Sequence, residues 1–259
     1  MIKPAPDFLI IGAAKSGTTS LIADLKSHPE IFTPGYEIEY FSYNHDMGDD
    51  WYRSVFTEDE KVQGEKSPSY LFETGCHERI FRYHPGMKLI VLLREPVQRA
   101  FSNWTMRQHV QHRLLKQSHE FNQRNPVSIL NIGFSSLFEY YRSCPSDIIR
   151  RQRPLDIFER SLYLPQIQSI LNYFQRDQLL ILIAEHYFSD PARELQKICR
   201  FLNIGDFRNN DPVWKRKTDY RIKMNESDPK EMQRFYKPYN EALFDFLGYE
   251  IAEWNKLAT

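Results

Sequence analysis

Three short apolar runs indicate that the chain is built around buried strands. They are Phe8–Gly12, Lys88–Leu93 and Leu179–Ile183. Continuous apolar runs of this length are typical of strands that a parallel sheet buries on both faces, whereas a half-exposed strand alternates apolar and polar residues. The pattern therefore predicts three strands of a parallel sheet.

Apolar residues at helical spacing lie between these runs and after them. The expected helices, the last of them interrupted near Pro238, cover residues 18–28, 77–84, 161–175, 190–202 and 230–247. Cys199 shares the apolar face of the fourth helix, which predicts a core position rather than a redox role. Strands that alternate with helices predict an α/β fold with a central parallel sheet flanked by helices.

The stretch over residues 105–153 departs from this alternation, because it is polar and irregular. We expect it to be an insertion over the carboxyl edge of the sheet, within one domain that spans residues 1–259. His109 and His112 in this stretch have the spacing of a metal pair, but no acidic or thiol cluster completes a coordination set. A solvated helix face explains them equally well, so we expect no metal.

Charge and cysteine content narrow the choice of partners. Lys plus Arg and Asp plus Glu each number 34, so no net field attracts nucleic acid or an anionic membrane. No run approaches the roughly 20 apolar residues of a membrane span, and the first residues do not read as a signal peptide. Cys76, Cys144 and Cys199 have neither metal nor disulfide spacing, which favours a reducing, cytoplasmic location.

The segment Gly12–Thr19 has the pattern of a P-loop-like phosphate loop. It lies where a strand turns into a helix, a place where backbone N–H groups and the helix dipole bind anions. A nucleoside triphosphate loop has Lys where this chain has Thr18, and the one lysine of the loop, Lys15, comes three residues earlier. The strand at 88–93 ends in Arg94 rather than in a magnesium-binding Asp. The loop therefore suits a 5′-phosphate and one further oxyanion without a metal, and a turn without a ligand is the alternative.

A second anion site is predicted at the end of the strand at 88–93. Arg94 follows this strand, and Ser102 lies about two turns into the next helix, so both side chains can reach one anion. A surface ion pair is the alternative role for Arg94. Two anion sites at the carboxyl ends of parallel strands fit a nucleotide that carries phosphate at both ends of its ribose.

Five segments, in this order, resemble the superfamily of sulfotransferases that use 3′-phosphoadenosine 5′-phosphosulfate (PAPS). They read AAKSGTTSL at 13–21, GEKSPSY at 64–70, LLREPVQRAFSNW at 92–104, EHYFSDP at 185–191 and FYKPYN at 235–240. The chain is most similar to the branch that contains heparan sulfate sulfotransferases and related bacterial enzymes. The resemblance spans nearly the whole chain and implies one sulfotransferase domain with a P-loop-like phosphosulfate loop.

The resemblance also implies how PAPS binds, with no metal. Lys15 would contact the bridging oxygen and the leaving phosphate. The other implied nucleotide contacts are Ser16, Gly17, Thr18 and Thr19 at the 5′-phosphate, Arg94 and Ser102 at the 3′-phosphate, and Arg216 and Lys217 in a loop that closes over it. A solvated charge run is the alternative for the basic residues at 215–217.

The catalytic base of this branch lies in a KEPHFF-like segment, which residues 36–41, YEIEYF, resemble. Glu37 matches the base, whereas Tyr36 replaces the Lys of the family and Glu39 replaces its His. Lys66 would orient the acceptor or offset charge on the sulfonyl oxygens, and a simple ion pair is the alternative role for Glu37. The catalytic residues implied are Lys15, Glu37 and Lys66.

The resemblance implies transfer of a sulfonyl group from PAPS to a hydroxyl acceptor. The departures at Tyr36 and Glu39 remove cationic groups beside the base, which favours a neutral or weakly anionic acceptor over a polysulfated glycan. Arg142 and the basic residues at 150–153 argue the other way, because they could line a distal part of the cleft. A small-molecule kinase with a degenerate phosphate loop and a non-catalytic nucleotide-binding module are the alternative functions.

Overall fold

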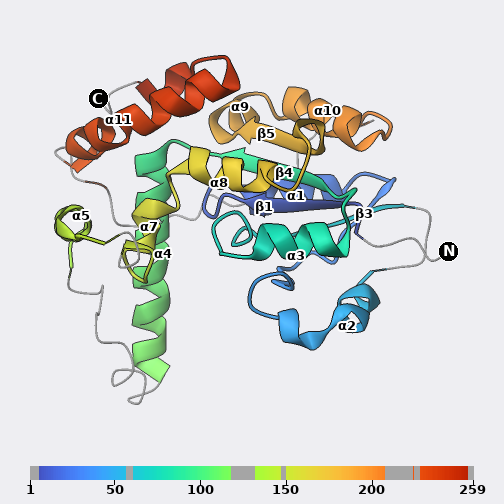
Figure 1. Ribbon diagram of the computed structural model, residues 1–259, viewed down its shortest axis with the longest axis horizontal. Helices are drawn as coiled ribbons and strands as arrows, with labels where there is room; N and C mark the ends of the chain where they lie inside the picture. Colours follow the sequence, from blue (N-terminus) through green and yellow to red (C-terminus); the bar gives the residue numbers. More distant parts are fainter. Residues whose placement is uncertain are drawn as a thin grey trace. The chain divides into compact units, whose positions relative to one another are not determined.

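The computed structural model describes residues 6–56, 61–117, 132–146, 150–207, 224 and 228–255 (Figure 1). The chain forms two compact units, each built from two segments. The first unit comprises residues 1–94 and 165–217, and the second comprises residues 95–164 and 218–259.

The first unit contains a five-stranded sheet in the order β2-β3-β1-β4-β5, and all of its pairings are parallel. The strands are β1 (Phe8–Gly12), β2 (Ile31–Phe32), β3 (Val62–Lys66), β4 (Lys88–Leu93) and β5 (Leu179–Ile183). The three predicted strands and the predicted parallel sheet are confirmed. β2 and β3 were not foreseen, because β2 has only two residues and β3 reads VQGEK, which lacks an apolar run.

The helices of the first unit cover the sheet and contribute to its apolar core. They are α1 (Thr18–Lys26), α2 (Asp49–Ser54), α3 (Cys76–Tyr83), α9 (Ala184–Ser189) and α10 (Pro191–Leu202). Helix α1 packs against β1, β2 and β3, while α9 and α10 pack against β5. Asp190 caps α10 by accepting a hydrogen bond from the backbone N–H of Arg193 at 3.1 Å. Cys199 is fully buried in the core, as predicted.

The second unit is helical. Its elements are α4 (Pro96–Gln117), α5 (Phe134–Ser143), α7 (Asp156–Glu159) and α11 (Asp228–Leu247), and the chain passes to the first unit within α8 (Tyr163–Leu171). Helix α4 packs against α7 and α11, and aromatic side chains from α4, α5, α7 and α11 form the core. Residues 105–153 were expected to be irregular. Instead, residues 105–117 continue a regular helix and residues 134–143 form another.

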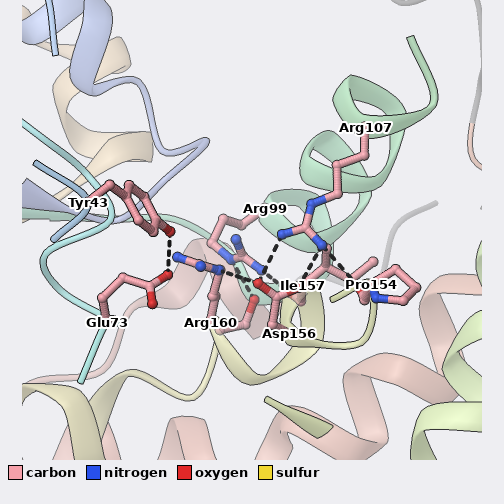
Figure 2. A network of polar contacts seen from close by, with 9 residues as sticks. Tyr43, Glu73, Arg99, Arg107, Pro154, Asp156, Ile157 and Arg160 are labelled. Atoms are coloured by element: carbon pink, nitrogen blue, oxygen red, sulfur yellow. Dashed lines mark hydrogen bonds and ion pairs between the residues drawn. The ribbon is translucent and has the colours of Figure 1, made fainter. Parts of the chain in front are cut away.

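Buried arginines surround one carboxylate in this unit (Figure 2). The guanidinium of Arg107 contacts both oxygens of Asp156, at 2.6 and 3.0 Å, and Nε of Arg160 contacts Oδ2 at 3.0 Å. Burial alone would raise the pKa of Asp156, but the hydrogen bonds and charges of Arg107 and Arg160 lower it. The fully buried Arg99 donates to the hydroxyl of Ser161 at 2.7 Å. The ion pairs of Asp156 thus link α4 to α7.

The predicted interruption of the last helix near Pro238 is wrong, because α11 continues through this residue. Proline removes one helical hydrogen bond, a cost that tertiary packing outweighs here. Tyr236 is fully buried and its hydroxyl donates to the carbonyl of Phe158 at 3.0 Å, and Leu243 beyond the proline is also buried. Buried residues before and after Pro238 therefore hold the helix together, and the spacing of apolar residues in the sequence does not reveal these contacts.

Candidate active site

The phosphate loop lies between β1 and α1, and two glycines make its path possible. A Cβ atom on Gly12 would lie 2.6 Å from Cβ of Leu71, too close for any side chain. Gly17 is the N-cap of α1 with φ of 100°, a left-handed conformation that favours glycine. A Cβ atom there would also lie 2.6 Å from the ring of Phe188. The sequence therefore needs glycine at both ends of this tight turn.

Ser16 carries the clearest sign of an anion site in this loop. Its side chain is fully buried, and its hydroxyl has no hydrogen-bond partner among the described residues. A buried hydroxyl without a partner costs free energy, so such groups are normally hydrogen-bonded to protein, water or a ligand. The N-cap of α1 is Gly17, which has no side chain to cap the helix. The hydroxyl of Ser16 and the first turn of α1 thus fit a phosphate or phosphosulfate group.

Arg94 is tied to the phosphate loop from the end of β4. Its Nη1 donates to the backbone carbonyl of Lys15 at 3.0 Å, and Lys15 itself adopts φ of 75°. Ser102 lies on α4 in the second unit. The contact places Arg94 beside the loop, and the predicted convergence of Arg94 and Ser102 on one 3′-phosphate stays a prediction.

Lys66 joins the predicted base to the phosphate loop. It is the last residue of β3, and its side chain is 7% exposed. The ammonium group contacts Oε1 of Glu37 at 2.5 Å and donates to the hydroxyl of Thr19 at 3.2 Å. The structure thus brings together three residues that were singled out from separate motifs.

Glu39, which stands where the family has His, is held by hydroxyl groups. Its carboxylate accepts hydrogen bonds from Ser42, at 2.5 Å, and from Ser69. Burial raises the pKa of Glu39 in spite of these two bonds, and the neighbouring charges of Glu37 and Glu73 act in the same direction. The backbone adopts φ of 55° at Glu39. This glutamate therefore fixes a tight turn in the segment that carries Glu37.

Glu65 is a buried carboxylate that the sequence reasoning missed. Its oxygens accept hydrogen bonds from the hydroxyls of Ser67, at 2.7 Å, and Tyr52, at 3.3 Å. Burial raises the pKa of Glu65 to about 7, although these hydroxyls and Tyr70 oppose the shift. The acidic residue beside Lys66 in the segment GEKSPSY was the available signal, but β3 itself was not foreseen.

Several other predicted residues lie in the second unit or are not described. Arg216 and Lys217 lie outside the described residues. Arg142 pairs with Glu231 inside the second unit. His109 is exposed on α4, and no group of three or more His, Cys, Asp or Glu among the described residues could hold a metal ion. No described helix combines the length and the apolar character that crossing a membrane requires.

Comparisons with known proteins agree with this geometry. A model of the family described as sulfotransferase domain matches residues 5–234. Mouse heparan sulfate glucosamine 3-O-sulfotransferase 5 is 24% identical over 273 residues, covering 96% of this chain and 74% of that protein. Human heparan sulfate glucosamine 3-O-sulfotransferase 3B1 is 29% identical over 204 residues, covering 78% of this chain and 47% of that protein. The crystal structure of a sulfotransferase from Alicyclobacillus acidocaldarius matches with a TM-score of 0.70 and 26% identity, covering 97% of this chain and 99% of that one.

The family match covers most of the chain and includes residues of both compact units. Members of this family take their sulfonyl group from PAPS. The buried hydroxyl of Ser16 at the N-terminus of α1 fits the phosphate end of that donor. The chain therefore belongs to the sulfotransferase domain family and is a PAPS-dependent sulfotransferase.

Proposed function

We propose that this enzyme transfers the sulfonyl group of PAPS to a hydroxyl acceptor by in-line displacement, with Glu37 as the base. Bound PAPS supplies a sulfonyl group that is activated by its 5′-phosphate leaving group. Glu37 takes the proton of the acceptor hydroxyl, and Lys15 stabilises negative charge on the departing phosphate. Lys66 orients the acceptor or offsets charge on the sulfonyl oxygens.

The contact of Lys66 with both Glu37 and Thr19 is the observation that supports this proposal most directly. A base for in-line transfer must reach the proton of the acceptor hydroxyl, which attacks from the side opposite the leaving phosphate. The Lys66 ammonium bonds to the carboxylate of Glu37 on one side and to the phosphate loop on the other. Glu37 keeps 46% of its side chain exposed, so an acceptor can approach it. Family membership favours this reaction over a kinase or a non-catalytic module.

The remaining nucleotide contacts form part of the same proposal. Ser16, Gly17, Thr18 and Thr19 hold the 5′-phosphate, and no metal takes part. Arg94 and Ser102 stay the predicted contacts of the 3′-phosphate, and the predicted contacts Arg216 and Lys217 lie outside the described residues. We also propose a reducing, cytoplasmic location, which is supported by three cysteines that are all buried and free.

We further propose a neutral or weakly anionic hydroxyl acceptor. The charged side chains of residues 36–43 are Glu37 and Glu39, and both are acidic. Tyr36 and Tyr43 on the same segment are 57% and 55% exposed, and the hydroxyl of Tyr43 donates to Glu73 at 2.8 Å. An acidic and aromatic border repels a polyanion and packs well on an uncharged carbon skeleton.

Replacement of Glu37 by Gln tests the role of the base. Gln keeps the size of the side chain but cannot accept a proton, so turnover should fall by roughly 100-fold or more. The affinity for adenosine 3′,5′-bisphosphate, measured by calorimetry, should stay within about twofold of wild type, since the nucleotide is held by other residues.

Glu78→Gln on the surface of α3 is the matched control. It makes the same chemical change and loses one exposed ion pair, with Arg82, but it belongs to none of the predicted nucleotide or acceptor contacts. It should keep wild-type turnover. Retention of turnover in Glu37→Gln would remove Glu37 as the base, and a parallel loss of nucleotide affinity would reduce it to a structural ion pair.

A further inference from the structure

The last two residues of β3 are both linked to the same neighbouring segment, Lys66 directly and Glu65 through a hydroxyl group. Successive side chains of a strand point in opposite directions. Lys66 points to the phosphate loop and binds the carboxylate of Glu37. Glu65 points to the other face, where it is fully buried beside Tyr52 and Tyr70. Both faces of β3 therefore carry a group that acts on residues 37–41.

The carboxylate of Glu65 reaches the backbone of this segment through a hydroxyl group. The hydroxyl of Ser67 donates to Oε2 of Glu65 at 2.7 Å and accepts from the backbone N–H of Glu39 at 2.9 Å. The hydroxyl of Tyr70 accepts from the backbone N–H of Phe41 at 3.3 Å, and Tyr70 also lowers the pKa of Glu65. One hydrogen-bonded relay thus runs from the carboxylate to the amide of Glu39, and a second hydroxyl, that of Tyr70, binds the amide of Phe41 in the same turn.

The direction of the hydrogen bonds decides which further group each hydroxyl can bind. A hydroxyl has one proton to donate and lone pairs with which to accept. Because the hydroxyl of Ser67 donates its hydrogen bond to Glu65, its lone pairs are left to accept from the amide of Glu39. Such linked bonds in a buried site strengthen one another and fix a single arrangement.

We propose that Glu65 is a positioning residue, which acts through Ser67 to hold the turn at residues 39–41, where Tyr70 binds the amide of Phe41, and so keeps Glu37 against Lys66. This inference rests on the proposed role of Glu37 as the base. The side chain of Glu65 lies on the face of the sheet opposite to that of Lys66, so it touches no reacting group. Its effect on turnover comes from the placement of the segment, where a shift of about 1 Å costs on the order of 100-fold in rate.

The first test measures the relay without any substrate. Amide hydrogen exchange at Glu39 should become roughly 3- to 10-fold faster in Ser67→Ala, which loses one hydrogen bond. Ser67→Thr keeps a hydroxyl and should exchange nearly as slowly as wild type. Tyr70→Phe should have the same effect at Phe41. Ser27→Ala is the control, since it loses a similar bond to the carbonyl of Asp24 at the end of α1.

The second test asks whether the relay acts through the base. Ser67→Ala should lower kcat by roughly 10- to 100-fold while its affinity for adenosine 3′,5′-bisphosphate is unchanged, and Ser67→Thr should recover most of the loss. In a Glu37→Gln background, the Ser67→Ala change should cost less than threefold more, because the group being positioned is already absent.

Three results overturn the proposal: unchanged exchange at Glu39 in Ser67→Ala, equal losses in the wild-type and Glu37→Gln backgrounds, or an equal loss of kcat in Ser27→Ala. Failure of the proposed function gives a different pattern. If Glu37 is not the base, Glu37→Gln alone keeps its turnover, while the exchange experiment still reports whether the hydroxyl of Ser67 holds the segment.

Discussion

Individual buried polar residues give this site its character. Ser16 has a hydroxyl without a partner in the described structure, Lys66 joins Glu37 to the phosphate loop, and Glu65 is buried among hydroxyls. Each of these groups is costly to bury unless something satisfies it. We expect bound PAPS to satisfy the hydroxyl of Ser16, whereas residues of the protein itself satisfy Lys66 and Glu65.

The raised pKa of Glu65 leads to a pH-dependent stability. The folded pKa is about 7 against an ordinary value of 4.5, so the folded state binds more protons than the unfolded state between these values. The free energy of unfolding that this group contributes is fully present below pH 4.5 and is lost as the pH rises through 7. The loss amounts to at most about 3 kcal/mol, since one pKa unit corresponds to about 1.4 kcal/mol.

Glu65→Gln removes this titration but keeps an acceptor for the hydroxyl of Ser67. Relative to wild type, the variant should therefore gain stability when the pH is raised from 5 to 8. Urea unfolding at the two pH values measures the difference, and the shifts that come from Glu39 cancel because both proteins contain it. Parallel pH profiles for the two proteins would contradict the assignment.

Strands with a continuous apolar run could be predicted from the sequence, whereas a strand that depends on pairing with distant segments could not. The strands β1, β4 and β5 carry long apolar runs, so their bounds could be read from the sequence. The strand β3 is buried but ends in Glu65 and Lys66, and it exists because β1 and β2 pair with it. The motif residues Lys66 and Glu37 were recognisable, whereas the relay behind them depends on a strand that no pattern indicated.

The junction of the phosphate loop and α1 offers a test at the scale of an element. Gly17→Ala places a side chain in a left-handed conformation and against the ring of Phe188. We expect it to weaken adenosine 3′,5′-bisphosphate binding by roughly tenfold or more and to lower the free energy of unfolding by about 1–2 kcal/mol. Calorimetry and urea unfolding measure the two effects.

Gly75→Ala is a close control for this change. Gly75 is the N-cap of α3 with φ of 82°, and a Cβ atom there would meet nothing within 4 Å. It should lose a similar stability and bind the nucleotide as wild type does. If both variants bind normally, the conformation of Gly17 is not important for the phosphate site.

At the scale of the whole molecule, the family is shown by the similarity over residues 5–234, but the acceptor is not. The sequence already predicted a PAPS-dependent sulfotransferase, because the motifs at both nucleotide phosphates were present in order. Acceptor recognition depends on how side chains that are distant in the sequence combine. The two relatives described above are named for heparan sulfate, whereas the segment around Glu37 is acidic and aromatic.

Turnover on two classes of acceptor decides between these possibilities. We expect uncharged alcohols and phenols to be sulfated faster than heparan-type glycans at matched concentration. Glu39→Gln should lower the turnover less than Glu37→Gln does, because the carboxylate of Glu39 is bound to Ser42 and Ser69. A clear preference for the glycan that falls steeply with salt would contradict the proposed acceptor.

The burial of the three cysteines makes each of them a natural label for unfolding. Burial raises the pKa of Cys76 to about 12 and that of Cys199 to about 11, so in the folded protein these thiols stay protonated and do not react with alkylating reagents. Cys76 and Cys199 lie in the first unit and the buried Cys144 lies in the second. Brief alkylation during denaturation, followed by mass spectrometry of the peptides, therefore reports on each unit separately in a chain that needs no engineered probe.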